Sequence, residues 1–109
     1  MRVDVVSPEG VVWSGEAELV VARTVEGELG VMADHEPVMA ALATGAVEIV
    51  HAGGRTEIGL HGGFLQVVDN QVTLLADRAR VAEGGRADAI ELAEQLAERP
   101  EFEEGFGAT

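Results

Sequence analysis

The sequence predicts a mainly β protein, with an N-terminal antiparallel β-sandwich and a short C-terminal α-helix. Over residues 1–82, short runs rich in Val, Ile and Leu are separated by glycine-containing turns at intervals of about ten residues, which is typical of a sandwich or barrel. From residue 83 onward the apolar residues recur with helical spacing instead. We therefore expect a sandwich domain over 1–82 and an acidic helix with a tail over 83–109.

The β region divides into short predicted strands. They cover residues 3–6, 10–14, 16–23, 29–32, 37–41, 45–51, 55–61, 63–68 and 71–76. In "AVEIVHAGGRTEIGL", Val47 and Ile49 alternate with Glu48 before a glycine turn, and the same alternation returns after it. A second hairpin, "FLQVVDNQVTLLA", turns at Asp69 and Asn70. Two consecutive hairpins indicate antiparallel pairing.

The C-terminal region reads as one amphipathic helix in "RADAIELAEQLAERP". Its apolar stripe consists of Ala89, Leu92, Ala93 and Leu96, at positions i, i+3, i+4 and i+7. Asp88 and Glu91 have the spacing of a capping box, and Pro100 opposes continuation of the helix. A helix of this length is marginal alone in water, so we expect it to pack on another surface.

Composition excludes several classes of function. With 20 acidic and seven basic residues among 109, the chain carries a net charge of −13, which disfavours direct binding to nucleic acids or anionic lipids. It has no cysteine, so thiolate chemistry and disulfides are excluded. No apolar run is long enough to span a membrane and the N-terminus lacks a signal peptide. We expect a protein on the cytoplasmic side that reaches a membrane only through a partner.

The three histidines are candidate metal ligands. His35, His51 and His61 show no HxH or HxxxH spacing, although His51 and His61 flank the "AGGR" hairpin and are candidates for cross-strand neighbours. A metal-dependent β-barrel enzyme needs them to converge with a third ligand that the sequence does not nominate. Ser7 and Ser14 lie beside turns rather than in a GxSxG elbow, which gives nucleophilic catalysis no support.

Other polar and glycine-rich segments also favour structural interpretations. The carboxylates of Asp34 and Glu36 stand in an acidic, exposed loop, where solvated charge is the commoner role. The glycine pairs at 53–54, 62–63 and 84–85 lack the lysine of a phosphate loop and are interpreted as turns, bulges and hinges. A non-catalytic protein is expected, and a ligand-binding β-sandwich module with a deep apolar pocket remains an alternative.

Three collinear motifs carry a resemblance to a known family. They are "VVSPEGVVWSGEAELVVART", "GELGVMADHEPV" and "LHGGFLQVVDNQVTLLADRA", and they lie in order within residues 1–82. In combination they resemble the epsilon subunit of the rotary F-type ATP synthase. The resemblance implies a ten-stranded N-terminal β-sandwich and C-terminal helices. It also implies a non-catalytic, cofactor-free role in the central stalk, bound to the gamma subunit and the membrane rotor ring and coupling proton transport to ATP synthesis.

The resemblance also implies a location and an interface. The subunit would sit at the cytoplasmic face of the cell membrane as a peripheral part of the complex, with no direct membrane insertion. The segment expected to contact gamma and the ring comprises Glu28, Leu29, Gly30, Val31, Met32 and His35. This chain departs from the family's "LPGH" or "YPGH" by reading "MADH", with Ala33 and Asp34 where the family has Pro and Gly.

The C-terminal region departs further from the family. Some members bind ATP through a motif of the form I/L-D-x-x-R-A, completed by arginines on a second helix. The corresponding residues here are Glu83, Arg86 and Ala87, and the two intervening glycines do not fit the motif. Only ten residues follow Arg99, too few for a second helix. We therefore expect no ATP binding, and weak or absent inhibition of ATP hydrolysis.

Overall fold

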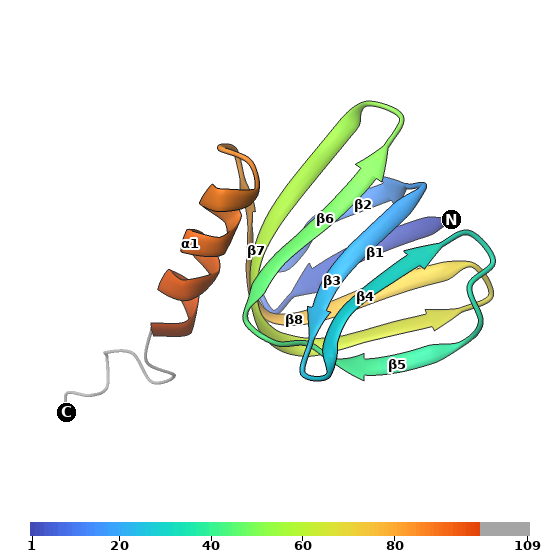
Figure 1. The fold of residues 1–109 in the computed structure, drawn as a ribbon, viewed down its shortest axis with the longest axis horizontal. Helices are drawn as coiled ribbons and strands as arrows, with labels where there is room; N and C mark the ends of the chain where they lie inside the picture. Colours follow the sequence, from blue (N-terminus) through green and yellow to red (C-terminus); the bar gives the residue numbers. More distant parts are fainter. Residues whose placement is uncertain (99–109) are drawn as a thin grey trace.

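A computed structural model describes residues 1–98 as eight strands and one helix (Figure 1). The elements are β1 (Arg2–Ser7), β2 (Gly10–Glu16), β3 (Leu19–Thr24), β4 (Gly27–Met32), β5 (Val38–Ala41), β6 (Gly45–His51), β7 (Gly54–Val68), β8 (Gln71–Ala82) and α1 (Arg86–Glu98). The mainly β fold with one C-terminal helix is confirmed. The segments predicted as strands 55–61 and 63–68 are two parts of the single strand β7. The predicted helix stop at Pro100 lies outside the described residues.

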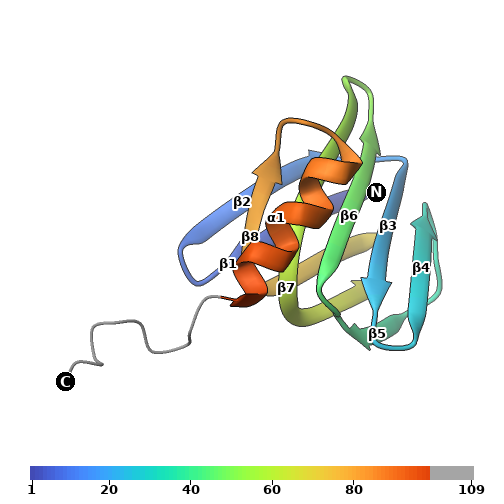
Figure 2. The same ribbon diagram turned by 60° about the vertical axis from the view of Figure 1, so that its left-hand side comes forward.

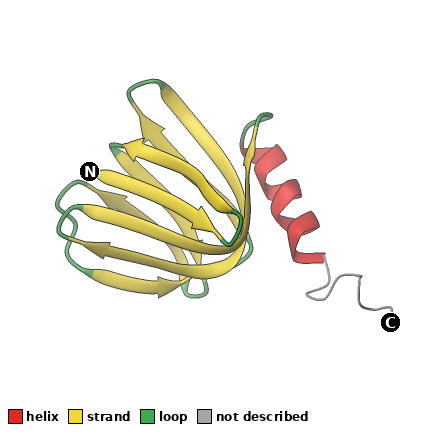
Figure 3. Cartoon of the chain, turned by 180° about the vertical axis from the view of Figure 1, so that it is seen from behind, coloured by secondary structure: helices red, strands yellow, loops and turns green. Residues whose placement is uncertain are grey.

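The strands form one sheet that folds over on itself, in the order β2-β1-β8-β7-β6-β3-β4. One part of β7 pairs with β6, and the other part pairs with β5. Because β8 follows β7 throughout, both strands run through both layers of the sandwich (Figure 3). The first layer contains β2, β1 and β5, and the second contains β6, β3 and β4; each also contains one segment of β7 and one of β8.

Counted by layers, the sandwich has five strand segments on each side, so the expected ten strands correspond to eight continuous ones. The expected antiparallel pairing needs one correction, since β1 and β8 run parallel. Their pairing joins the two ends of the β region, residues 2–6 with 71–75, and local hairpin rules cannot predict such a long-range contact.

The fold-over of β7 occurs at a pair of glycines. Gly62 and Gly63 have φ angles of 74° and 115°, and the β7–β8 register is the same on both sides of them, with His61 opposite Arg78 and Gly63 opposite Ala76. The strand therefore bends through two positive-φ glycines without an inserted residue, so the expected bulge at this glycine pair is a kink instead. A Cβ at Gly63 would overlap the carbonyl oxygen of Leu75, so a side chain cannot be accommodated there without movement of the backbone.

Both predicted hairpins are confirmed. The β7–β8 turn places Asp69 and Asn70 at φ angles of 49° and 62°, as a two-residue turn of the I′ type requires. The β6–β7 turn uses Gly54 at φ 126°. Of the glycine pairs that the sequence marked as turns, bulges and hinges, 53–54 lies at this turn, 62–63 at the bend of β7, and 84–85 in the segment before α1.

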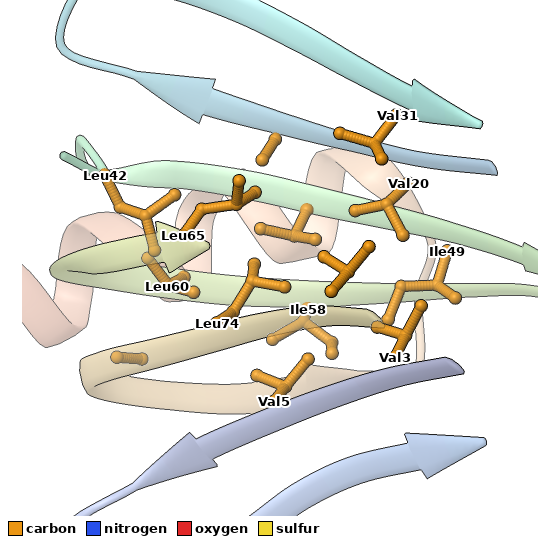
Figure 4. Packing of buried hydrophobic residues seen from close by; sticks show 14 of the residues in the cluster. Val3, Val5, Val20, Val31, Leu42, Ile49, Ile58, Leu60, Leu65 and Leu74 are labelled. Atoms are coloured by element: carbon orange, nitrogen blue, oxygen red, sulfur yellow. The ribbon is translucent and has the colours of Figure 1, made fainter. Parts of the chain in front are cut away.

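The inward faces of the two layers form the main core (Figure 4). Its sixteen buried residues are at most 6% exposed: Val3, Val5, Ala17, Val20, Ala22, Val31, Leu42, Val47, Ile49, Ile58, Leu60, Leu65, Val67, Val72, Leu74 and Ala76. Trp13 packs against this cluster from β2. Since the molecule's own side chains occupy the interior, the outer faces are the candidate functional surfaces.

Helix α1 packs on the outer face of the second layer, beside β6 and β7 (Figure 2). It buries Ala89, Ala93 and Leu96, three of the four residues of the predicted stripe. The approach is close because Gly59 has no side chain. A Cβ at Gly59 would lie 2.7 Å from the carbonyl oxygen of Ala89 and 3.0 Å from the nitrogen of Ala93.

The ends of α1 differ from the predicted caps. The helix begins at Arg86, so Asp88 lies in its first turn rather than at the N-cap, and its carboxylate accepts a hydrogen bond from the N–H of Gly84 at 3.1 Å. The predicted capping box of Asp88 with Glu91 is therefore wrong. At the other end, the guanidinium of Arg78 on β8 donates to the carbonyl of Leu96 at 2.6 Å. This bond satisfies a helix-end carbonyl and ties α1 to the sheet.

Candidate protein-interaction surfaces

The predicted contact segment forms β4, an edge strand of the second layer, and the loop that follows it. Glu28, Gly30 and Met32 are exposed, and Leu29 is half-buried. Val31 is completely buried in the core. The expectation that Val31 contributes to a contact surface is therefore corrected, because alternate residues of a strand point to opposite faces.

The β4–β5 loop has a defined course around its departure from the family pattern. Asp34 has a φ of 64°, the left-handed conformation in which glycine is most comfortable and aspartate is tolerated. Its backbone N–H donates to Oδ1 of Asn70 at 2.8 Å, which ties the loop to the β7–β8 turn. His35 donates its backbone N–H to the carbonyl of Met32, and its Nδ1 lies 2.7 Å from the carbonyl oxygen of Glu36. The aspartate thus occupies a glycine-like conformation.

The same edge strand contacts the start of α1. The guanidinium of Arg86 lies 3.2 Å from Oε2 of Glu28, and both side chains are about half exposed. Of the three degenerate ATP-motif positions, Arg86 is therefore engaged with the sheet. Ala87 is exposed on the first turn of α1, and Glu83 is exposed in the linker that precedes it.

The structure does not bring His51 and His61 together. His51 hydrogen-bonds to the hydroxyl of Thr56 and stacks obliquely near Trp13, with ring centroids 5.4 Å apart. His61 lies at the other end of the paired strands and hydrogen-bonds to Thr44 at 2.8 Å. Their proposed cross-strand proximity is wrong. Residues 1–98 contain no cluster of three or more His, Asp or Glu side chains placed to hold a metal ion.

A row of apolar side chains crosses the outer face of the first layer, which sequence reasoning did not identify. The cross-strand register runs from Val11 to Val6, Leu75, Phe64 and Ala41, one residue from each of five neighbouring strands. Val11 is 68% exposed, Phe64 55% and Leu75 53%. We call these five residues the apolar row. A shallow hollow of about 350 Å³ lies along it, between Phe64, Leu75 and Pro8.

The neighbouring row on the same face is polar. It runs through Ser14, Asp4, Thr73 and Gln66 on β2, β1, β8 and β7, and ends on β5 at the exposed Met39. The carboxylate of Asp4 accepts hydrogen bonds from the hydroxyl of Ser14 and from Nε2 of Gln71, and these bonds hold the pKa of Asp4 below its ordinary value of 3.8. A charged, hydrogen-bonded row beside an uncovered apolar one resembles the division between the rim and the core of a protein interface.

The local sequence contains a weak sign of the apolar row. Val5 and Val6, and Leu74 and Leu75, are consecutive large apolar residues, and one member of each pair must point away from the core of a strand. Such runs indicate strands with apolar residues on both faces. The alignment of the outward members into one row depends on the parallel β1–β8 pairing.

Within residues 1–98, α1 is the single helix, and it lacks the length and apolar character needed to cross a bilayer.

Comparisons with known proteins agree with this architecture. The sequence profile described as ATP synthase, Delta/Epsilon chain, beta-sandwich domain matches residues 1–82. The ATP synthase epsilon chain of Alkalihalophilus pseudofirmus is 40% identical over 98 residues, covering 90% of this chain and 74% of the relative. The epsilon chain of Frankia casuarinae is 45% identical over 82 residues, covering 74% of this chain and 96% of the relative.

Solved structures show the same fold. A chain in the cryo-EM structure of Euglena gracilis mitochondrial ATP synthase, titled OSCP/F1/c-ring, matches with a TM-score of 0.70 and 30% identity over 88% of this chain. A chain of the Tetrahymena thermophila mitochondrial ATP synthase central stalk and c-ring matches with a TM-score of 0.61 over 72% of this chain, at 18% identity. This chain spans 61% and 64% of those two chains. The chain therefore belongs to the delta/epsilon family of ATP synthase subunits, as an epsilon chain whose part in the enzyme is structural and regulatory rather than catalytic.

Proposed function

We propose that this chain is a rotor subunit of the central stalk that binds the gamma subunit through the apolar row and the membrane rotor ring through β4 and the β4–β5 loop. In this role it couples proton transport to ATP synthesis at the cytoplasmic face of the cell membrane. The observation that carries the proposal is the apolar row, a cross-strand set of uncovered hydrophobic side chains on an otherwise filled sandwich.

The apolar row suits a large protein partner better than a small ligand. Its side chains stand on five adjacent strands and form an extended surface with a shallow hollow rather than a deep cavity. Burying exposed apolar area stabilises a complex by roughly 25 cal/mol per Å² before the costs of association. Phe64 and Leu75, adjacent at the centre of the row, are the expected anchors.

The second contact is assigned to the edge of the other layer. Glu28, Gly30 and Met32 project from β4, and His35 lies in the loop that follows. The loop is held to the β7–β8 turn through Asn70, so it is presented as a shaped surface. The resemblance implies that this segment contacts gamma and the rotor ring, and its exposed residues are available for the ring contact.

The C-terminal region supports a chain that does not bind ATP and inhibits hydrolysis weakly or not at all. Arg86 is paired with Glu28 rather than free for a phosphate, and Ala82 and Glu83 stand where the family motif has Ile or Leu and Asp. We expect removal of residues 83–109 to leave assembly with gamma and the ring intact and to change ATP hydrolysis little. Loss of gamma binding on truncation would instead make α1 part of the assembly contact.

The gamma contact is tested by affinity measurements with the purified cognate gamma subunit. Leu75→Glu and Phe64→Glu place a charge at the centre of the row and are expected to weaken binding about 30-fold or more, the effect of an interface hot spot. Ile90→Glu is the matched control, because Ile90 is also an exposed apolar residue but lies on α1, over the other layer. Circular dichroism checks that each variant is folded. Equal affinity of all three variants and the wild type would contradict the proposal.

The ring contact is tested separately in complexes reconstituted from the chain, gamma and the rotor ring. Met32→Glu changes an exposed side chain on β4 and is expected to lower retention on the ring without lowering affinity for gamma. The converse result, with gamma binding lost and ring binding kept, would reverse the assignment of the two surfaces.

A further inference from the structure

Glu57 is a carboxylate buried beneath the start of α1. It lies on β7, its side chain is on the outer face of the second layer, and the residue is 8% exposed. Its Oε1 is shielded from solvent and has no hydrogen-bond partner within residues 1–98. A buried polar atom without a partner is costly and calls for an explanation.

The groups that face Glu57 come from every element around it. Glu48 lies directly opposite on β6, and its carboxylate is bound to Arg55 of β7 at 2.6 Å. The facing residue of β8 is Ala82, which carries no charge. From α1, Arg86 supplies a positive charge, but its guanidinium pairs with Glu28.

We propose that Glu57 makes the docking of α1 on the sheet pH-dependent, with the protonated carboxyl group favouring the docked helix and the ionised carboxylate weakening it. Arg86, Arg55 and the positive end of the helix dipole act in the opposite direction, towards the ionised form. None of them provides a hydrogen bond to Oε1. Burial of the carboxylate and the facing charge of Glu48 therefore outweigh them.

The docking interface is small enough to respond to one ionisation. Gly59, two residues beyond Glu57 on the same face, lies directly under the backbone of α1. Beyond that contact, the helix buries Ala89, Ala93 and Leu96, of which two are alanines with little apolar area. Ionisation of Glu57 thus occurs at the edge of the contact between α1 and the sheet, which is only modestly stable.

The direction of the pH effect follows from the two states of Glu57. When α1 is docked, burial and then the charge of Glu48 raise the pKa of Glu57 above its ordinary value of 4.5. When α1 is released, the carboxyl group returns to water and to that ordinary value. The docked state therefore binds the proton more tightly. Docking is strongest below about pH 4.5, weakens as pH rises towards the raised pKa, and is constant above it.

Amide hydrogen exchange of the full chain from pH 4 to 8 tests this inference. Protection of the α1 amides, corrected for intrinsic exchange and referred to the core strand β6, should fall by up to tenfold per pH unit within the sensitive window. In Glu57→Gln, a neutral side chain of the same shape, protection should stay at the low-pH level across the whole range. Glu91→Gln is the matched control, because it removes one charge from an exposed position on α1 and should retain the wild-type pH dependence.

A second variant links the effect to its surroundings. Glu48→Gln removes the facing charge and should lower the pKa of Glu57 towards 4.5. The pH range over which docking of α1 weakens should then become narrower. A pH-independent protection in the wild type, or a slope in Glu57→Gln equal to that of the wild type, would overturn the proposal.

Discussion

The two outer faces of the sandwich differ in what covers them. On the second layer, the chain covers the face with α1, and the residues beneath the helix are small or polar, such as Gly59, Ala46 and Glu57. On the first layer, Phe64 and Leu75 stand uncovered. The face with small residues holds the chain's own helix, while the face with large apolar residues is left open to solvent. The face that packs against α1 therefore differs in side-chain size from the face that is proposed to bind a partner.

The bend in β7 makes this division possible, because both layers depend on it. Gly63→Ala is expected to lower the free energy of unfolding by about 2–6 kcal/mol, since it combines a positive φ with a clash against the backbone at Leu75. Urea unfolding followed by the fluorescence of Trp13, the only tryptophan, measures it. Gly30→Ala is the control, because its added Cβ meets nothing within 4 Å. Equal stability of the two variants would show that the layers do not need the bend.

Two adjacent leucines on β8 sharpen the contrast between core and open face. Leu74 is fully buried and Leu75 is 53% exposed. We expect Leu74→Ala to cost about 2–5 kcal/mol of unfolding free energy because it leaves a cavity. Leu75→Ala should change stability by less than about 0.5 kcal/mol. Similar losses in the two variants would mean that Leu75 is covered in the isolated chain, and the apolar row would then no longer be an open surface.

The sequence predicts those parts of the molecule whose signals are local. The hairpins follow from alternation and turn residues, and the helix follows from the stripe around Ala89 and Ala93, because these signals are local. The apolar row depends on β1 lying parallel beside β8, a pairing between residues about seventy positions apart. The burial of Glu57 depends on where α1 docks. Both features are products of tertiary contacts, so no local pattern reveals them.

Within the predicted contact segment, the sequence also leaves undetermined which side chains of the strand are exposed. Family resemblance predicted a contact segment that falls on β4 and His35, but it could not separate the exposed Glu28 and Met32 from the buried Val31. Strand alternation makes that separation once the inward face is known. The glycine-like conformation of Asp34 was also hidden, since aspartate occurs more often at negative φ.

The covered face offers a test of how α1 is held. Gly59→Ala introduces a Cβ 2.7 Å from the carbonyl oxygen of Ala89 and 2.9 Å from Cβ of Leu92. It should weaken docking by about 1–3 kcal/mol while the sandwich stays folded. Exchange of the α1 amides should accelerate, and the Trp13 unfolding signal should still report a cooperative sandwich. If α1 keeps its wild-type protection, the close approach at Gly59 is not needed for the covered face.

The smallest expected effect concerns the ion pair that joins α1 to the edge of the sheet. Arg86 and Glu28 are 3.2 Å apart and about half exposed, so a double-mutant cycle of Arg86→Ala and Glu28→Ala should give a coupling free energy of about 0.2–1 kcal/mol, falling with salt. The pair stands where the helix-covered face meets the proposed ring contact, since Glu28 belongs to both. Binding of the ring to Glu28 would compete with Arg86 for that carboxylate. It would weaken the docking of the start of α1 by no more than the coupling free energy of the ion pair. A coupling above 2 kcal/mol would make the ion pair a principal attachment of the helix, and the small apolar contacts over Gly59 would then be secondary.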